Sequence, residues 1–158
     1  MSKKGVIWLS NVAKDIIIPS KGVFRVVFLY IGQGEATIMA IPDGSNHRFV
    51  LIDCNVDNQF GGIRLVDMLK DLTDNLNLFI NTHPHNDHLK GIKEISSTIN
   101  ISEVWHSGHN PGRDHSEAYD ELKGLIKELP EDKVKTLTGS RSSQALGDVT
   151  VHILAPAE

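Results

Sequence analysis

The ten residues THPHNDHLKG at positions 82–91, which we call the signature loop, decide the fold of this chain. Within six of its residues, the loop carries four groups that can bind metal ions: His83, His85, Asp87 and His88. So many polar groups in one place would destabilise a buried core, whereas imidazole nitrogen and carboxylate oxygen are ligands of divalent cations. The composition of the loop therefore predicts a metal site.

The segments on either side place the signature loop between a strand and a helix. Upstream, residues 76–81 read LNLFIN, a short apolar run entered from Asp and Asn turn residues, which is typical of a buried strand. Downstream, Leu89, Ile92, Ile95 and Ile99 recur at about helical spacing. We therefore expect a strand that ends at the loop and a helix from about residue 89 to 99.

The spacing inside the loop indicates how the donors divide. Side chains two residues apart in extended backbone point the same way, so His83 and His85 can chelate one ion. Asp87 and His88 fall where the helix starts and can face a second ion, while Gly91 permits close approach of neighbouring backbone. The alternative is a polar loop whose histidines form hydrogen bonds with the backbone. This alternative does not explain why a carboxylate lies between the histidines at the spacing of metal ligands.

Connectivity predicts which other residues lie near the loop. A strand–helix–strand–helix–strand pattern from residue 49 to 106 predicts parallel pairing with right-handed crossovers. In such sheets the loops after the strands gather on one edge, where ligands bind. We therefore expect Asp53, the signature loop, His106 and His109 on that edge, where His106 or His109 could contact substrate or supply a ligand.

The whole pattern predicts an α/β fold, with α and β mixed around one mixed sheet. The expected elements are an N-terminal strand or hairpin within 1–21, further strands at 23–31, 36–41, 49–53, 101–106, 134–137 and 149–154, and helices at 65–72 and 118–129. For the last helix, Asp114 with Glu117 three residues on predicts a capping-box start, and Pro130 a stop. A turn at 147–148 precedes the final strand.

Length and composition bound the class of protein. A chain of 158 residues with 40% hydrophobic and 23% charged residues fits one soluble globular domain. The net charge of −4 argues against a general nucleic-acid-coating surface but not against a local groove. A single cysteine, Cys54, excludes an intrachain disulfide and fits a reducing compartment. No apolar run reaches about 18 residues, so we expect no membrane segment and a cytoplasmic location.

These residues resemble the metallo-β-lactamase superfamily, whose signature is HxHxDH with a preceding Asp at a strand end, matched here by VLID at 50–53. A second stretch, VFLYIGQGEA at 27–36, is similar to the FLDVGQGDA strand-turn of the branch that includes the hydrolase domain of DNA-uptake competence proteins. Glu35 keeps the charge of that branch's second Asp, whereas Tyr30 replaces the first. The resemblance runs from about residue 23 to the end of the chain.

The resemblance implies a larger fold than this chain supplies. The superfamily has an αββα sandwich of two similar halves, and a third His, a bridging Asp and a final His from the second half complete its site. Residues 1–158 would form a single domain corresponding to the first half, either truncated before the second half or completed by a second chain, for example in a homodimer. The uncovered sheet would expose an apolar face, which favours association.

The resemblance also implies a role for each site residue. His83 and His85 would bind one divalent ion and Asp87 and His88 a second, with Zn²⁺ as first choice and Mn²⁺ or Fe as alternatives. In the family, the Asp at the position of Asp53 orients the metal-site loop by hydrogen bonds. The alternative role for Asp53 is that of a turn residue whose carboxylate caps backbone amides. Asp87 would also handle the proton of the attacking water, as in one-metal relatives.

The implied function is a metal-dependent hydrolase, in which metal-activated water attacks a phosphodiester or related ester of a small molecule or nucleic acid. Lys90, Lys93, Arg113 and Arg141 could line a phosphate-binding rim, although scattered basic residues usually face solvent. The alternative function is a catalytically incomplete metal-binding or assembly module.

Overall fold

A six-stranded mixed sheet forms the centre of the molecule, in the order β1-β2-β3-β5-β7-β8. The computed structural model describes residues 14–56, 64–137 and 142–154. The strands of the sheet are β1 (Arg25–Phe28), β2 (Thr37–Asp43), β3 (Asn46–Ile52), β5 (Leu78–Asn81), β7 (Val104–His106) and β8 (Val134–Thr136). The first three pair antiparallel, and β3, β5, β7 and β8 pair parallel, so the predicted parallel pairing is confirmed.

Burial along the strands follows from their positions in the sheet. The edge strand β1 alternates half-buried and exposed side chains, whereas all four side chains of β5 are buried, as expected for a central parallel strand covered on both faces. The paired residues Ile38 and Leu51 face one core, and their chain neighbours Met39 and Val50 face a second core on the opposite side.

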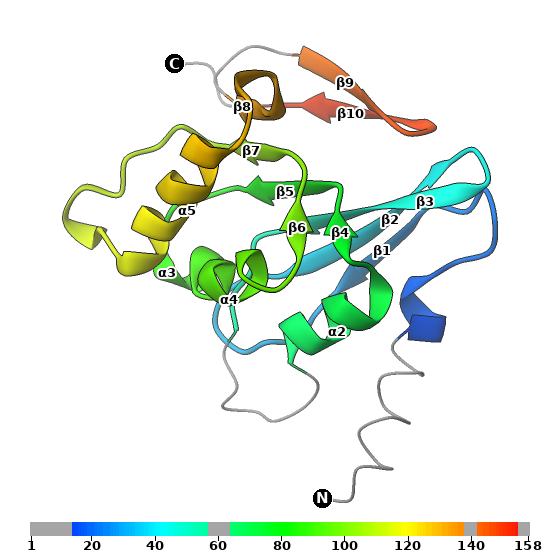
Figure 1. Ribbon diagram of the computed structural model, residues 1–158, viewed down its shortest axis with the longest axis horizontal. Helices are drawn as coiled ribbons and strands as arrows, with labels where there is room; N and C mark the ends of the chain where they lie inside the picture. The colour runs from blue at the N-terminus through cyan, green and yellow to red at the C-terminus, as the bar shows by residue number, and fades with distance from the viewer. Residues whose placement is uncertain (1–13, 57–63, 138–141, 155–158) are drawn as a thin grey trace, which may run out of the picture.

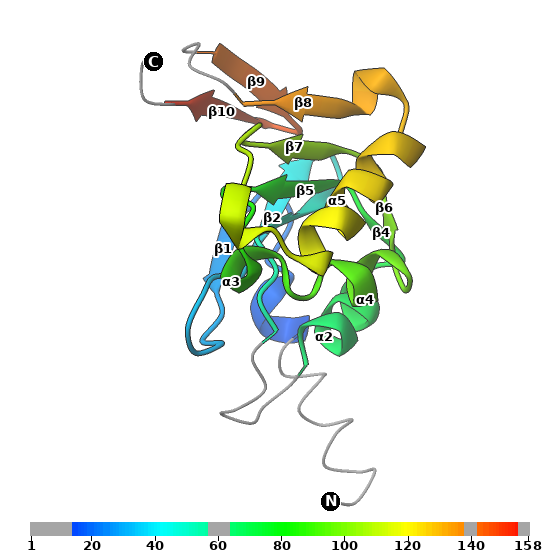
Figure 2. The same cartoon turned by 90° about the vertical axis from the view of Figure 1, so that its left-hand side faces the viewer.

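Helices cover one face of the sheet (Figures 1 and 2). They are α2 (Leu65–Leu72), α4 (Ile92–Ser96) and α5 (Glu117–Glu128), and the short α3 (Asn86–Leu89) lies within the signature loop. Leu69, Ile95 and Leu122 from these helices join Leu51 and Phe79 of the sheet in the main core. Among the described residues, no helix has the length and apolar character that crossing a membrane would require.

A hairpin of β9 (Ser142–Leu146) and β10 (Val149–Ile153) covers part of the other face (Figure 1). Leu146 packs there with Val50, Ile80 and Trp105 in the second core. The predicted turn at 147–148 is confirmed, and Asp148 N–H donates to the carbonyl of Pro42, 2.7 Å away. Strand β9 was not predicted, because SSQAL carries little of the β-branched or aromatic character that marks a strand.

Three predicted elements are each divided in two. The predicted strand at 76–81 covers the end of β4 (Asn75–Leu76) and all of β5. The predicted helix at 89–99 covers the end of α3 and all of α4, and the predicted strand at 101–106 covers the end of β6 (Asn100–Ile101) and all of β7. Asn77 ends β4 because its N–H donates a hydrogen bond to the Phe49 carbonyl and its side-chain oxygen accepts one from the Phe49 N–H. Strand β4 pairs with β6 in a separate two-stranded sheet. Gly91 interrupts the helix because its N–H donates to the carbonyl of Cys54 at 2.8 Å.

Two predicted termini are also corrected. Residues 14–17 form a helical turn where a strand or hairpin was expected, and residues 1–13 lie outside the described part of the chain. Helix α5 is capped by Ser116, whose hydroxyl accepts from the N–H of Tyr119, whereas Asp114 lies in a preceding 3-10 turn at 112–114. Ser116 is itself a preferred N-cap residue and lies nearer the apolar repeat.

Gly91→Ala is expected to destabilise the fold by about 1–3 kcal/mol, because a β-carbon there would lie 2.6 Å from both the Cys54 carbonyl oxygen and a Val56 methyl group. Gly124, in the middle of α5, has nothing within 4 Å of such a β-carbon, so Gly124→Ala should stabilise by about 0.5–1 kcal/mol. Urea unfolding of both variants measures this contrast. Equal effects would contradict close packing at Gly91.

Candidate metal centre

The loops that follow three neighbouring strands meet at one edge of the sheet. Asp53 follows β3, the signature loop follows β5, and His109 lies in the loop after β7. The Nδ1 atom of His88 lies 2.8 Å from an Asp53 carboxylate oxygen, and the ring of His109 lies 5.4 Å from that of His83. The structure thus brings together residues that the predicted connectivity places on one edge.

Asp53 is fully buried, and its carboxylate holds the signature loop in place. One oxygen accepts from the Thr82 N–H at 2.9 Å and from the Asn81 side-chain amide at 3.2 Å. The other accepts from the Thr82 hydroxyl and from the His88 ring. A carboxylate has about four lone-pair positions, so this set leaves Asp53 no free position for a further partner.

The backbone at Asp53 adopts a left-handed conformation, with φ of 52°. Asp53 is the one non-glycine with positive φ in the described ranges, and Asp tolerates this region better than most residues. The turn directs the carboxylate from the end of β3 towards Thr82 at the end of β5. Local backbone strain and four hydrogen bonds therefore act at the same residue.

The contact with Asp53 fixes the orientation of the His88 ring. Because Nδ1 faces the carboxylate, it carries the proton, and the Nε2 lone pair is left for another partner. Nε2 lies 3.8 Å from an oxygen of Asp87. Two donors bound to one Zn²⁺ at about 2.0–2.2 Å can lie no more than about 4.2 Å apart, so Asp87 and His88 can share an ion.

His83 and His85 place two ring nitrogens side by side. His83 Nε2 lies 2.9 Å from His85 Nδ1, well within the separation that two ligands of one ion allow. Both rings are partly buried, and Pro84 between them is buried. The other nitrogen of His85 lies 3.8 Å from a carboxylate oxygen of Asp114, which is exposed.

The two histidines after β7 differ. The ring of His109 stacks on that of His83, with an angle of 27° between the ring planes and 5.4 Å between the ring centres. His106 faces other groups: its Nδ1 accepts from the N–H of Gly108 at 3.1 Å, and its Nε2 lies 3.3 Å from the Thr136 hydroxyl. Among the described residues, His109 is therefore the better placed of the two to supply a ligand.

Sequence reasoning did not assign a ligand role to Glu35. One oxygen of Glu35 forms, with donor atoms of Asp53 and His88, a group whose members lie within 4.8 Å of one another. The signal was present, because Glu35 stands at the charged position of the GQGE turn. Since Asp53 is already saturated with hydrogen bonds, Glu35 is the freer carboxylate of that group.

The GQGE turn packs tightly against the signature loop. Glu35 N–H donates to the Asp87 carbonyl at 3.2 Å, and Asn55 N–H donates to the Glu35 carbonyl at 3.0 Å. Gly34 has φ of 109°, and a β-carbon there would collide with the Asp87 carbonyl oxygen. Only glycine fits this position, so the turn and the loop are held as one unit.

The surroundings of His83 favour its neutral form. Burial, followed by the neighbouring imidazoles of His85, His88 and His109, lowers its pKa below the ordinary 6.5, against an opposing effect of Asp87. A neutral imidazole is the form that binds a metal ion. Burial raises the pKa of the Cys54 thiol, which keeps that group protonated and unsuited to metal binding.

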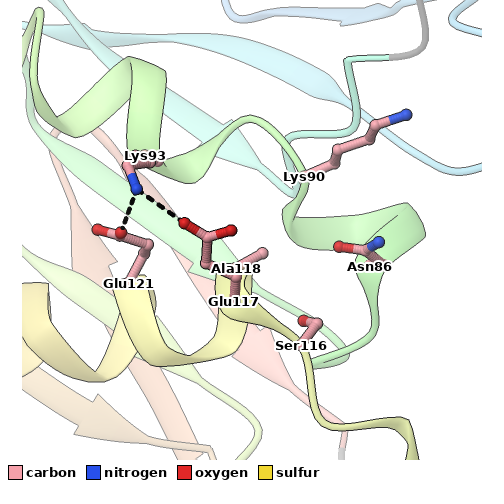
Figure 3. Close-up of a pocket in the computed structure, with 7 residues that line it drawn as sticks. All are labelled: Asn86, Lys90, Lys93, Ser116, Glu117, Ala118 and Glu121. Carbon is pink, nitrogen blue, oxygen red and sulfur yellow. Dashed lines mark hydrogen bonds and ion pairs between the residues drawn. The ribbon is translucent and has the colours of Figure 1, made fainter.

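The predicted basic rim is only partly present. Lys93 forms ion pairs with Glu117 and Glu121 at 2.8 and 2.9 Å (Figure 3), so its charge is already neutralised. Arg113 is exposed in the 3-10 turn, and Arg141 lies outside the described residues. Lys90 lines a cavity beside Asp87.

Comparisons with known proteins give a structural neighbour but no family. No protein-family model and no curated protein matches the chain. Eighteen chains of solved structures match, among them a β-lactamase domain protein from Burkholderia ambifaria, with a TM-score of 0.46 and 12% sequence identity. The alignment covers 84% of this chain and 46% of that chain, so this chain spans less than half of the neighbour's length.

In the metal-free chain, an NMR titration of the His83 ring should give a pKa below 6.5. Below pH 6.5 the unfolded state then binds more protons than the folded state, so folding stability falls as the pH drops through the unfolded value. His83→Gln should weaken this loss, as measured by urea unfolding at a series of pH values. A His83 resonance that titrates at or above 6.5 would contradict this account.

Proposed function

We propose that this chain is a metal-dependent hydrolase that cleaves a phosphodiester or related ester. The observation that carries the proposal is the convergence of His83, His85, His88 and His109 with Asp87 at the edge where the parallel strands end. Imidazole nitrogen with carboxylate oxygen is a donor set suited to Zn²⁺, Mn²⁺ and Fe. Structural packing alone gives no reason to gather so many titratable groups on partly exposed loops.

The distances support two groups of donors. His83 and His85 would hold one ion, and Asp87 and His88 would hold a second. Zn²⁺ is our first choice because imidazole nitrogens dominate the set, and Mn²⁺ or Fe are the alternatives. Glu35 could add an oxygen ligand near His88.

Asp53 would act on the metal centre indirectly. Its bond to Nδ1 of His88 selects the tautomer whose Nε2 is free, and its bonds to Thr82 hold the start of the loop. Carboxylates that accept from the second nitrogen of a ligating histidine commonly play this part. Asp53 is thus proposed as a positioning residue rather than a ligand.

The chemistry would combine the bound cation with the residues of the loop. When present, a divalent cation lowers the pKa of water and polarises an ester oxygen. Asp87 is partly exposed and lies within reach of the same space, so its carboxylate could accept the proton of the attacking water. The substrate preference for phosphodiesters follows from the resemblance of residues 27–36 to the competence-protein branch.

We also propose that the described residues form one domain, equivalent to the first half of a larger sandwich that further chain or a second copy completes. Phe28 at the end of edge strand β1 is 81% exposed, Tyr30 two residues after the strand is 83% exposed, and Val26 within β1 is 38% exposed. The register of β1 with β2 places Val26 beside Met39, on the sheet face that the β9–β10 hairpin covers elsewhere. An apolar surface of this kind supports an additional covering element.

The proposal is tested by metal content and turnover. The purified chain should retain divalent metal, and His85→Ala should lose most of it by mass spectrometry of bound metals. His152→Ala, at an exposed position on β10, is the matched control and should bind metal as the wild type does. Metal content that survives His85→Ala would reject binding at the signature loop.

The same samples separate an enzyme from a binding module. Hydrolysis of bis(p-nitrophenyl) phosphate with added Zn²⁺ or Mn²⁺, abolished by Asp87→Asn, is the result expected of a hydrolase. Full metal occupancy without turnover by the wild type, with either metal, would instead identify a metal-binding module.

Asp53→Asn should weaken Zn²⁺ binding about 10–100-fold in a chain that still folds, although with lower stability. Asparagine also tolerates the left-handed backbone, but its amide nitrogen cannot accept from the donors that now surround the carboxylate. Competition against a chromophoric chelator measures the affinity, and circular dichroism checks the fold. An unchanged affinity in a folded variant would rule out the positioning role.

A further inference from the structure

We propose that Lys90, with the side-chain amides of Gln33 and Asn86, binds the anionic group of the substrate beside the metal centre, and that the substrate is therefore a phosphate ester rather than a neutral ester. This inference rests on the proposed hydrolase function and specifies its substrate class. It concerns a cavity that shares only Asp87 with the proposed metal ligands.

A cavity of about 360 Å³ lies where the GQGE turn meets the signature loop, and it is lined by Gln33, Asn55, Asn86, Asp87 and Lys90. The size is within the range of small-molecule sites. Asp87 belongs both to this cavity and to the donor cluster, where it lies 3.8 Å from His88. A molecule in the cavity would therefore reach the proposed metal centre.

The cation in this cavity is available to a ligand. Lys90 is exposed, and within the described ranges no carboxylate lies within ion-pair distance of it. Lys93, three residues further along the chain, forms ion pairs with Glu117 and Glu121. Figure 3 shows the Lys90 side chain pointing away from that acidic pair, so Lys90 is not held in the same network.

Two side-chain amides that line the cavity are also available to donate hydrogen bonds to a ligand. Asn55 is committed, because its amide nitrogen donates to the Gln33 carbonyl and its amide oxygen accepts from the N–H of Val56. The side chains of Gln33 and Asn86 are exposed and have no hydrogen-bond partner in the part of the chain that the structure describes. Two amides and an ammonium group can together bind the oxygens of a phosphate.

The charge of Asp87 determines the conditions under which an anion binds. Its carboxylate would repel a phosphate group, and a divalent cation shared with His88 would offset that charge. Both the cation and Lys90 should therefore strengthen the binding of a phosphate ester. A neutral ester would gain nothing from the ammonium group, which is why the cavity favours an anionic substrate.

The test uses the full chain in the presence of Mn²⁺, with thymidine 5′-monophosphate as the probe and calorimetry as the readout. Lys90→Ala should weaken binding about tenfold, the loss of one charge-assisted contact, while Lys90→Arg should stay within about threefold of the wild type. Lys127→Ala removes an equal charge from an exposed position on α5 and should leave the affinity unchanged. Thymidine without phosphate should bind weakly and equally to all four proteins.

Equal affinity of Lys90→Ala and wild type for the nucleotide, or no binding by the wild type, would overturn the inference. Equal weakening by Lys90→Ala and Lys127→Ala would also overturn it, because a general charge effect would then explain the loss. Electron paramagnetic resonance on the same samples counts bound Mn²⁺. Nucleotide binding that depends on Lys90 without any phosphodiester turnover would contradict the proposed hydrolase while leaving the phosphate site established.

Discussion

The carboxylate of Asp53 is the constraint on which the rest of the site depends. It is buried at the end of β3, and it accepts from the backbone and side chain of Thr82, from Asn81 and from His88. Burial without these partners would be costly, because an unpaired charge away from water is strongly unfavourable. The same bonds fix the path of the signature loop and the tautomer of His88, so stability and chemistry share one group.

Close backbone contacts complete that arrangement. A side chain at Gly34 would collide with the Asp87 carbonyl, and a side chain at Gly91 would collide with the Cys54 carbonyl. These glycines let the GQGE turn and the start of the helical region pack directly on the loop that carries the histidines. Precise placement of donor atoms requires such support, because loops held only by their own side chains position ligands poorly.

Sequence reasoning predicted the parts of the structure that follow from local pattern and connectivity. The apolar run before the histidines and the helix–strand alternation were sufficient to place Asp53, His83 and His109 on one sheet edge. Interactions between distant segments were not predictable in this way. The bond from Asn77 to Phe49, which divides one apparent strand into two, and the cap at Ser116 depend on tertiary geometry. Glu35 carried a visible charge in its motif, but its distance from His88 required the fold.

The central claim is that imidazoles from one loop converge on a divalent cation at the ends of parallel strands. Anomalous diffraction at the zinc edge, from crystals of the full chain grown with Zn²⁺, tests this claim directly. A peak within about 2.0–2.2 Å of both His83 Nε2 and His85 Nδ1 is the predicted result. Zinc located only at other surface groups, with these two rings turned apart, would contradict the account.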